Sequence, residues 1–233
     1  MSTAEQHLAI LSKHLDLEDA IILDIGSGGG EVTLALSKRG AIVTGIECSR
    51  DQMCRASKHL RSGCRFLLGV GENLPFKESC FDASVFFNSI HHIPEECLSK
   101  AISDALKVTK PGGVIYVAEP MAEGPCFELD APVEDETEVR ELAQHALNQA
   151  RDSFSGWTEE TQEHYQVHFD YQKFDDYKDE MLRFDHSRTV RFEKIEDLLK
   201  AQFMKLSEKI NQGYRFYQPM LARCIRMKKC IKL

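Results

Sequence analysis

A glycine-rich run follows an apolar segment near the start of the chain. Asp24 ends that segment, and the run contains Gly26, Ser27, Gly28 and Gly30. Glycines let the backbone approach a ligand closely, and a helix that begins at Glu31 offers amide groups that favour negative charge. Glu47 closes the next apolar run, where an acid can hydrogen-bond the hydroxyls of a ribose. These residues predict a binding site for an adenosine-type cofactor.

The spacing of the glycines separates two kinds of cofactor. A dinucleotide fingerprint G-x-G-x-x-G that starts at Gly26 requires glycine at position 31, and Glu31 stands there instead. That missing glycine allows close helix–strand packing around a pyrophosphate. The spacing therefore counts against an NAD-binding oxidoreductase, which stays as an alternative interpretation. The pattern D-x-G-x-G-x-G resembles motif I of the class I methyltransferases.

Three further segments extend this resemblance. Residues 71–76 (GENLPF) look like the stretch near the adenine in that family, 87–93 (FNSIHHI) resemble the segment after its fourth strand, and 110–113 (KPGG) match the turn into its fifth strand. The segments occur in the family's order and cover about residues 20–120. By this ensemble the chain resembles the class I, S-adenosylmethionine-dependent methyltransferases.

The resemblance implies a role for each matching position. Asp24 orients the glycine loop and the methionine amino group, and the loop walls the methionine half of the cofactor. Glu47 holds the ribose, Cys48 lies against the adenine, and the Asn88 backbone fixes the amino-acid end.

One position departs from the family pattern. Many relatives carry an acid where Val70 stands, and that acid bonds the adenine amino group. Valine has no hydrogen-bonding group. Adenine recognition is therefore assigned to Glu72 or to the Gly71 amide, and the departure also leaves open a non-catalytic protein that binds S-adenosylmethionine as a ligand.

Methyl transfer needs few protein groups beyond those that position the reactants. S-adenosylmethionine carries an activated methyl group and leaves as S-adenosylhomocysteine, so holding the acceptor in line with the S–CH₃ bond is a large catalytic contribution. A general base helps when the acceptor is a hydroxyl or a protonated amine. The candidates are His91, His92 and Glu119, which follow the fourth and fifth predicted strands. The alternative for these side chains is a structural role in packing, capping or bonding a loop amide.

Composition and motif context limit the class of molecule that accepts the methyl group. The net charge of −8 counts against a general nucleic-acid binder. Cys126 follows a proline, as in cytosine C5 methylation, but it comes after the fifth predicted strand rather than the fourth. Asn88 is not followed by the Pro-Pro-Tyr of base amino methylation. We therefore expect a small-molecule acceptor, and no metal is predicted.

The remaining pattern predicts the elements that position these residues. Unbroken apolar runs at 20–25, 41–47, 65–69, 83–88 and 114–119 alternate with segments long enough for helices, at 31–39, 49–62 and 94–109. Such runs are typical of a parallel sheet buried on both faces. With further strands at 164–171 and 220–227, the expected fold is α/β and doubly wound. Its mostly parallel, seven-stranded sheet ends in an antiparallel strand.

The chain reads as a single domain, 1–233. We expect a cofactor-binding core at 1–120, which opens with a helix at 4–17, a helical lid at 121–212 and a closing strand at 213–233. Helices are predicted in the lid at 135–154, near 174–181 and at 188–206. Eight scattered cysteines without a Cys-x-x-Cys pair favour reduced thiols. No apolar run is long enough for a membrane span, so the expected location is the cytoplasm, and the oligomeric state is open.

Overall fold

A single twisted sheet organises the molecule. The computed structural model describes residues 2–60, 63–184 and 186–228. The main path of the sheet has the strand order β3-β2-β1-β4-β5-β8-β6. Its strands are β1 (Ile21–Ile25), β2 (Ile42–Glu47), β3 (Cys64–Leu68), β4 (Phe81–Phe87), β5 (Thr109–Pro120), β6 (Trp157–Tyr171) and β8 (Gly213–Met227).

The parallel half of the sheet agrees with the sequence prediction. Strands β1 to β5 pair in parallel, and β8 lies antiparallel between β5 and β6. The doubly wound fold with an antiparallel last strand is therefore confirmed. The strand count is corrected by β7 (Glu208–Ile210), a short eighth strand that pairs with β8 off the main path. Two of its three residues are exposed and charged, so no apolar pattern marks it as a strand.

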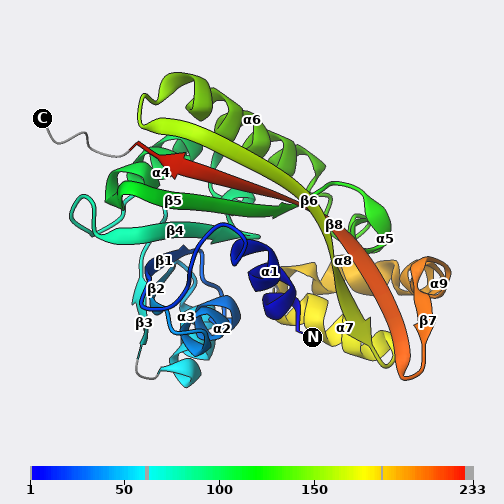
Figure 1. Ribbon diagram of the computed structural model, residues 1–233. Coiled ribbons are helices and arrows are strands. Elements are labelled where there is room, and N and C mark those ends of the chain that lie inside the picture. The colour runs from blue at the N-terminus through cyan, green and yellow to red at the C-terminus, as the bar shows by residue number, and fades with distance from the viewer. Residues whose placement is uncertain (1, 61–62, 185, 229–233) are drawn as a thin grey trace, which may run out of the picture.

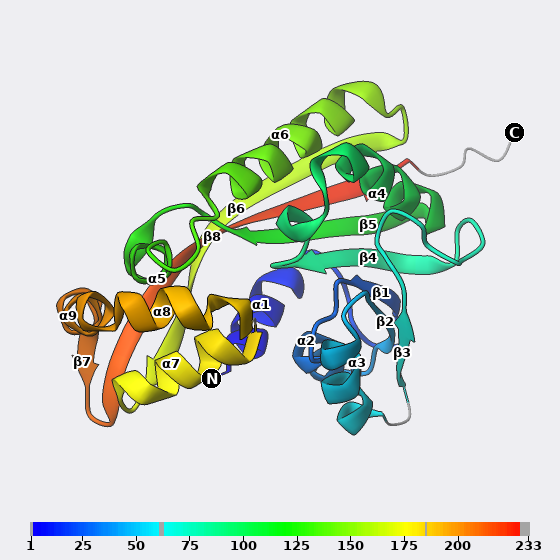
Figure 2. The same cartoon turned by 180° about the vertical axis from the view of Figure 1, so that it is seen from behind.

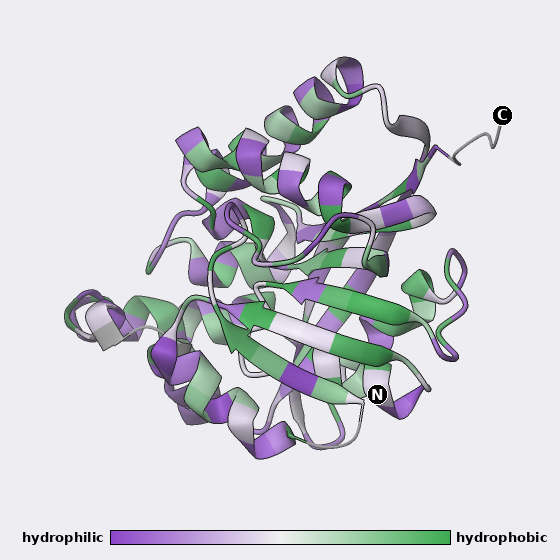
Figure 3. Ribbon diagram, turned by 90° about the vertical axis from the view of Figure 1, so that its left-hand side faces the viewer, coloured by the Kyte–Doolittle hydropathy of each residue, from purple (hydrophilic) through white to green (hydrophobic). Residues whose placement is uncertain are grey.

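Helices cover both faces of the sheet (Figures 1 and 2). On one face, α4 (Glu95–Val108) and α6 (Thr137–Ser153) contribute Leu98, Ile102 and Leu147 to the larger hydrophobic core. On the other, α1 (Thr3–Leu11) and α2 (Glu31–Lys38) contribute Leu8, Leu11 and Leu36 to a second core. The apolar residues gather along the central strands in Figure 3. The remaining helical segments of this half are α3 (Arg50–Ala56) and the 3₁₀ turns Ser57–His59 and Ile90–His92.

Strands β6 and β8 extend well beyond the end of β5. The β5–β8 pairing stops at Pro120 and Met220, whereas β6 and β8 stay paired as far as Tyr171 and Tyr214. We call residues 167–171 and 213–218 the overhang. Against it pack α5 (Gly124–Asp130), α7 (Phe174–Phe184), α8 (Thr189–Lys194) and α9 (Glu196–Leu206), with the turn His186–Arg188 between α7 and α8. A third, separate hydrophobic core forms there around Phe192, Phe203 and Phe216.

Several element boundaries differ from the predictions. The opening helix ends at Leu11 rather than at 17, and the helix predicted at 188–206 is divided at Ile195. Helix α5 was not predicted, because it begins with Gly124 and Pro125 and is only seven residues long. Residues 61–62 of the third predicted helix and 229–233 of the closing strand lie outside the described residues.

The segment 121–212 divides between two places. Helix α6 and most of β6 belong to the central sheet and its larger core, whereas α5, α7, α8 and α9 pack on the overhang. A lid role for this segment stays a prediction.

Candidate functional site

The glycine loop lies where the strand order reverses. Strand β1 has β2 on one side and β4 on the other, so the loop after β1 opens into the crevice at this switch point. The backbone amides of Gly26 and Ser27 both donate to the Ile46 carbonyl, at 2.9 and 3.0 Å. Gly30 has a φ of 88° and caps the N-terminus of α2. Its left-handed conformation lets the chain turn from strand to helix within a few residues.

Glu47 ties the glycine loop to the end of β2. Its carboxylate accepts hydrogen bonds from the backbone amides of Gly28 at 2.9 Å and Ser49 at 2.7 Å. A Cβ added to Gly28, which has a φ of 54°, would meet no atom within 4 Å. The loop therefore presents open space beside a fixed carboxylate, which fits the ribose side of an adenosine cofactor.

Asp24 and Ser27 lie beneath the loop. Asp24 is fully buried, and its Oδ2 accepts a hydrogen bond from Thr33 Oγ1 at 2.6 Å. Burial raises the pKa of the Asp24 carboxyl to about 7, although the Thr33 bond opposes the shift. Ser27 packs toward β2, because a Cβ on Gly45 would lie 2.7 Å from Ser27 Oγ. Both side chains therefore support the loop from below.

Asn88 directly follows β4, the strand that pairs with β1. It is exposed and has a φ of 49°, a left-handed conformation that asparagine tolerates better than most residues. Its backbone amide donates to the Ala118 carbonyl at 3.0 Å, so its own carbonyl is the backbone group left for a ligand. Ser89 Oγ donates to the Ile25 carbonyl at 2.7 Å, which joins the ends of β4 and β1.

Three residues are predicted to lie near the adenine, namely Cys48, Gly71 and Glu72. Cys48 is exposed, and its Sγ is 3.6 Å from Glu47 Oε1. Desolvation and then the charge of Glu47 raise the pKa of the Cys48 thiol, and Glu72 adds to this effect. A Cβ on Gly71 would lie 3.0 Å from Ile25 Cγ2, so that glycine packs against the end of β1. The charge of Glu72 thus reaches Cys48 beside Glu47, whereas Gly71 packs on the end of β1.

His91 and Glu119 form a buried pair at the ends of β4 and β5. His91 Nδ1 hydrogen-bonds Glu119 Oε2, and the backbone amides of Ser89 and Ile90 donate to Oε1 at 2.9 and 3.2 Å. Burial opposes the charge on both partners, but their mutual attraction outweighs it. The pKa of His91 is raised and that of Glu119 is lowered. Glu119 therefore has its donors within the protein and holds His91 in place.

His92 differs from its neighbour in exposure. Its ring is exposed to solvent, and the two histidine ring centroids are 4.0 Å apart. Desolvation of its protein-facing side and then the charge of His91 lower the pKa of His92. The three candidate catalytic residues are therefore brought together, and His92 is the one open to an incoming molecule.

Two residues beside this group were not among the predicted site residues. Glu136, at the start of α6, has Oε2 at 3.9 Å from His91 Nε2. Arg140 Nη2 donates to the same Glu136 oxygen at 2.6 Å, and its Nη1 donates to the Met121 carbonyl at 3.0 Å. The acidic run 134–138 resembles an ordinary solvated helix start. The spacing of Glu136 and Arg140, one helical turn apart, was the available signal for a fixed pair.

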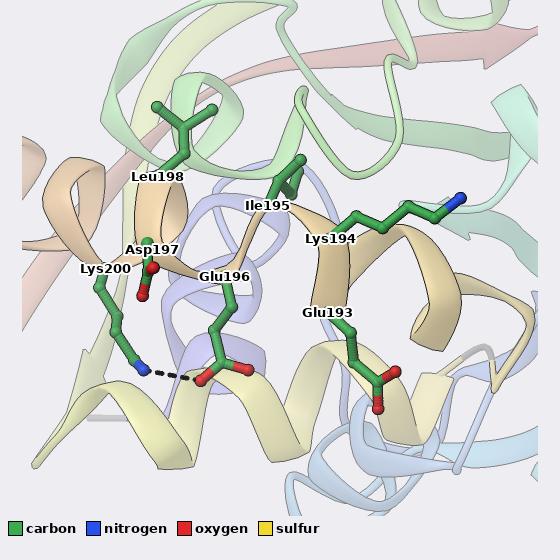
Figure 4. A pocket seen from close by; sticks show the side chains of 7 residues that line it. All are labelled: Glu193, Lys194, Ile195, Glu196, Asp197, Leu198 and Lys200. Atoms are coloured by element: carbon green, nitrogen blue, oxygen red, sulfur yellow. Dashed lines mark ion pairs between the residues drawn. The ribbon is translucent and has the colours of Figure 1, made fainter.

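Two hollows on the described surface lie away from the glycine loop and the histidines. One lies at the junction of α8 and α9 (Figure 4). Two of its charged side chains pair with each other, since Lys200 binds Glu196 at 2.8 Å, and Lys178 binds the same glutamate at 2.6 Å. The other lies at the β7–β8 turn, beside Arg215. Neither includes a residue of the glycine loop or of the histidine group.

A family model described as a methyltransferase domain matches residues 22–113. These residues include the glycine loop, Glu47, both histidines and the 110–113 turn. Over this segment, which is less than half of the chain, the sequence is similar to that methyltransferase family. An uncharacterized methyltransferase of Synechocystis is 32% identical over 98 residues, which are 42% of this chain and 46% of the relative. The malonyl-[acyl-carrier protein] O-methyltransferase of Pectobacterium atrosepticum is 30% identical over 128 residues, 55% of this chain and 48% of that protein.

The chain spans about half the length of the curated relatives it matches. Its fold is similar over a longer stretch to that of the YcgJ protein of Bacillus subtilis, with a TM-score of 0.62, 18% identity and coverage of 97% and 98% of the two chains. The [4+2]-cyclase SpnF has a TM-score of 0.56 at 19% identity, with coverage of 97% and 81%. A protein named for cyclisation thus shares the fold, so the fold by itself does not decide the reaction. Among the described residues no helix is long and apolar enough to cross a membrane.

Proposed function

We propose that this protein binds S-adenosylmethionine at the glycine loop and transfers its methyl group to a small-molecule acceptor by in-line displacement. The observation that carries the proposal is the Glu47 carboxylate, fixed by the amides of Gly28 and Ser49 at the edge of open space. When bound, the cofactor supplies a methyl group already activated on a sulfonium. The protein itself then has to hold the cofactor and the acceptor together and keep other molecules out.

The residues divide this task between the two lips of the crevice. Glu47 accepts hydrogen bonds from ribose hydroxyls, and the Asn88 carbonyl accepts one from the amino group of the cofactor. Cys48, Gly71 and Glu72 flank the adenine. On the other lip, His91 and His92 face the acceptor, while Glu119 keeps His91 in one orientation. Because His92 is exposed and His91 is not, His92 makes the first contact with the acceptor.

The acceptor is a small molecule in this proposal. The two relatives named above include an O-methyltransferase acting on an acyl-carrier-protein substrate, and a ubiquinone biosynthesis O-methyltransferase of Xylella fastidiosa is 33% identical over 116 residues, 48% of this chain and 46% of that protein. An oxygen acceptor is therefore the first class to try. The net charge of −8 makes nucleic acids the last class of acceptor to test. The cytoplasmic location belongs to the same proposal.

Two alternatives share the glycine loop. An NAD-dependent oxidoreductase and a non-catalytic binding protein would both need the cofactor crevice, but only an enzyme of the proposed kind makes S-adenosylhomocysteine. The test incubates the protein with S-adenosylmethionine and a panel of phenols, carboxylic acids and amines, and measures S-adenosylhomocysteine by mass spectrometry. We expect acceptor-dependent product. Tight cofactor binding without product across the panel would favour the binding protein.

A further inference from the structure

Three side chains with metal-ligand atoms meet at the acceptor lip. The imidazoles of His91 and His92 and the carboxylate of Glu136 each offer one ligand atom, and these atoms all lie within 4.8 Å of one another. Among the residues that the structure describes, this is the one such group of three or more. It lies at the end of β4 and the start of α6, beside the site already described but with no part in cofactor binding.

Two members of this group, His91 and Glu136, face each other without a hydrogen bond. His91 Nε2 and Glu136 Oε2 are 3.9 Å apart, which is too far for a hydrogen bond. With Nδ1 directed at Glu119, Nε2 is the only ring nitrogen of His91 that can act toward Glu136. A cation or a bridging hydrogen-bond donor between these two atoms would interact with both of them.

The support behind His91 is of the kind that metal-binding histidines have. Such a histidine almost always binds a carboxylate, carbonyl or water through its second ring nitrogen, which fixes the ring and raises the basicity of the ligand atom. Glu119 does this here, and it is itself fixed by the amides of Ser89 and Ile90 at 2.9 and 3.2 Å. Both side chains of the pair are almost fully buried, at 2% and 1% exposure.

Two arginines oppose a cation, since Arg188 places positive charge near His92 and Arg140 bonds Glu136. Arg140 is the one in direct contact with a proposed ligand. Its Nη2 lies 2.6 Å from Glu136 Oε2. A carboxylate has about four lone-pair positions, however, and carboxylates that bind metals are commonly hydrogen-bonded as well. The hydrogen bond from Arg140 uses Oε2 of Glu136, and the buried carboxylate of Glu119 favours positive charge at His91. Arg140 thus holds Glu136 beside the histidines, and the Glu136 carboxylate keeps lone pairs that can bind a cation.

We propose that His91, His92 and Glu136 bind a divalent transition-metal ion of the zinc class. Two imidazoles and one carboxylate are a known three-ligand set for zinc, which leaves a fourth position open in catalytic sites. Imidazole ligands favour such ions over magnesium and calcium. The prediction of no metal reflected the absence of closely spaced ligands in the sequence, because Glu136 is distant from the histidines along the chain.

The open fourth coordination position would allow the ion to bind the methyl acceptor. It faces the acceptor side of the crevice, since His92 is exposed there. An acceptor hydroxyl bound to the ion loses its proton to water more readily, and the resulting oxygen anion is the nucleophile for methyl transfer. This role, unlike the metal site itself, rests on the proposed function.

The test measures binding of Co²⁺ to the full-length chain after removal of metals with a chelator. Visible absorption follows the titration, and calorimetry with Zn²⁺ gives the affinity. We expect one equivalent bound with nitrogen and oxygen ligands, and no intense near-ultraviolet band from thiolate ligands. His92→Ala and Glu136→Ala should each lower the affinity by about a hundredfold or more, and Glu119→Gln by roughly tenfold, as for other residues behind a ligand.

His145→Ala is the matched control, because His145 is an exposed histidine of α6 that bonds only Gln149 among the contacts seen. It should bind metal like the unaltered chain. Circular dichroism and S-adenosylmethionine binding check that each variant is folded, and retention of cofactor binding separates failure of the metal site from failure of the proposed function. Absence of Co²⁺ uptake, a thiolate band, or equal affinity in His92→Ala and the control would each overturn the proposal.

Discussion

The two lips of the candidate site are built from contacts of different range along the chain. At the cofactor lip, Glu47 bonds an amide 19 residues away, and Asp24 bonds a hydroxyl 9 residues away. At the acceptor lip, Glu119 bonds the Ser89 amide 30 residues away and the His91 ring 28 residues away. Glu136, at the start of α6, comes from still further along the chain to lie beside His91. The cofactor lip is a local unit of strand, loop and strand, whereas the acceptor lip depends on how the second half of the chain folds back.

This difference implies that the two halves can be perturbed separately. The larger cores hold the parallel sheet together, and the third core holds the helices on the overhang. Variants in the third core should lower stability with little effect on cofactor affinity, whereas variants at the cofactor lip should lower cofactor affinity. The predictions below run from the largest expected change to the smallest.

Phe203→Ala should cause the largest loss of stability. Phe203 is 1% exposed, and its ring centroid lies 4.9 Å from that of Phe216. Truncating a buried phenylalanine costs about 3–5 kcal/mol of unfolding free energy. Urea unfolding measures the loss, with Leu198→Ala on the same helix as an exposed control. Calorimetry on the folded variant should show S-adenosylmethionine affinity within a few-fold of normal, and a large drop would mean that the two regions are not separable.

Glu47→Ala tests the cofactor lip. The substitution removes a carboxylate that bonds the amides of Gly28 and Ser49 and, in the proposed complex, the ribose. Loss of hydrogen bonds to a charged group costs about 1.5–3 kcal/mol each, so S-adenosylmethionine affinity should fall by about a hundredfold. Glu78→Ala, at an exposed carboxylate, is the control. Unchanged affinity in Glu47→Ala would show that the ribose assignment is wrong.

Asp24→Asn should change the dependence of stability on pH. The native protein keeps a proton on Asp24 up to about pH 7, whereas the unfolded chain releases it near pH 3.8. The unfolded state therefore binds fewer protons between these values, and native stability falls as pH rises through that window. Asparagine removes this loss, so the variant should gain melting temperature over the unaltered protein toward pH 8 while its cofactor affinity falls.

Asp82→Asn should change the dependence of stability on pH in the opposite direction to Asp24→Asn. Although burial opposes its charge, Asp82 accepts bonds from Lys110 Nζ at 2.8 Å and the Ile21 amide at 3.0 Å, and its pKa is lowered. Its contribution to stability is present above the ordinary pKa of aspartate and is lost as pH falls. Melting curves from pH 4 to 8 compare the two variants, and parallel curves for Asp24→Asn and the unaltered protein would contradict the account.

Cys48→Ser should give the smallest effect. Cys48 is exposed, and its Sγ contacts Glu47 only at 3.6 Å. Serine keeps a small polar side chain in the same place, so S-adenosylmethionine affinity should change by less than about threefold. A much larger loss would make the adenine contact more important than the ribose contact, and would move the main determinant of cofactor affinity away from Glu47.

The parallel sheet and the residues of the cofactor lip could be predicted from the sequence because their signals are local. Apolar runs locate β1, β2 and β4, and the glycines and Glu47 follow their ends directly. The resemblance to a known family added the roles of those positions. These roles and the catalytic assignments stay predictions until the variants are measured.

The acceptor lip was less predictable for physical reasons. His91 and His92 are adjacent in one 3₁₀ turn, and only the fold determines that one is buried against Glu119 and the other exposed. Glu136 looks like one more acid at a helix start until β5 and α6 place it beside His91. Helix α5 and strand β7 are short, and packing on the overhang rather than local pattern stabilises them.

Calorimetry with S-adenosylmethionine, S-adenosylhomocysteine and NAD tests the central claim most directly, because all three ligands would occupy the crevice after β1. The open glycine loop, Glu31 at its end and the fixed Glu47 carboxylate predict saturable binding of both sulfur compounds, with NAD giving no heat beyond dilution. Binding of NAD with no response to either sulfur compound would contradict the account.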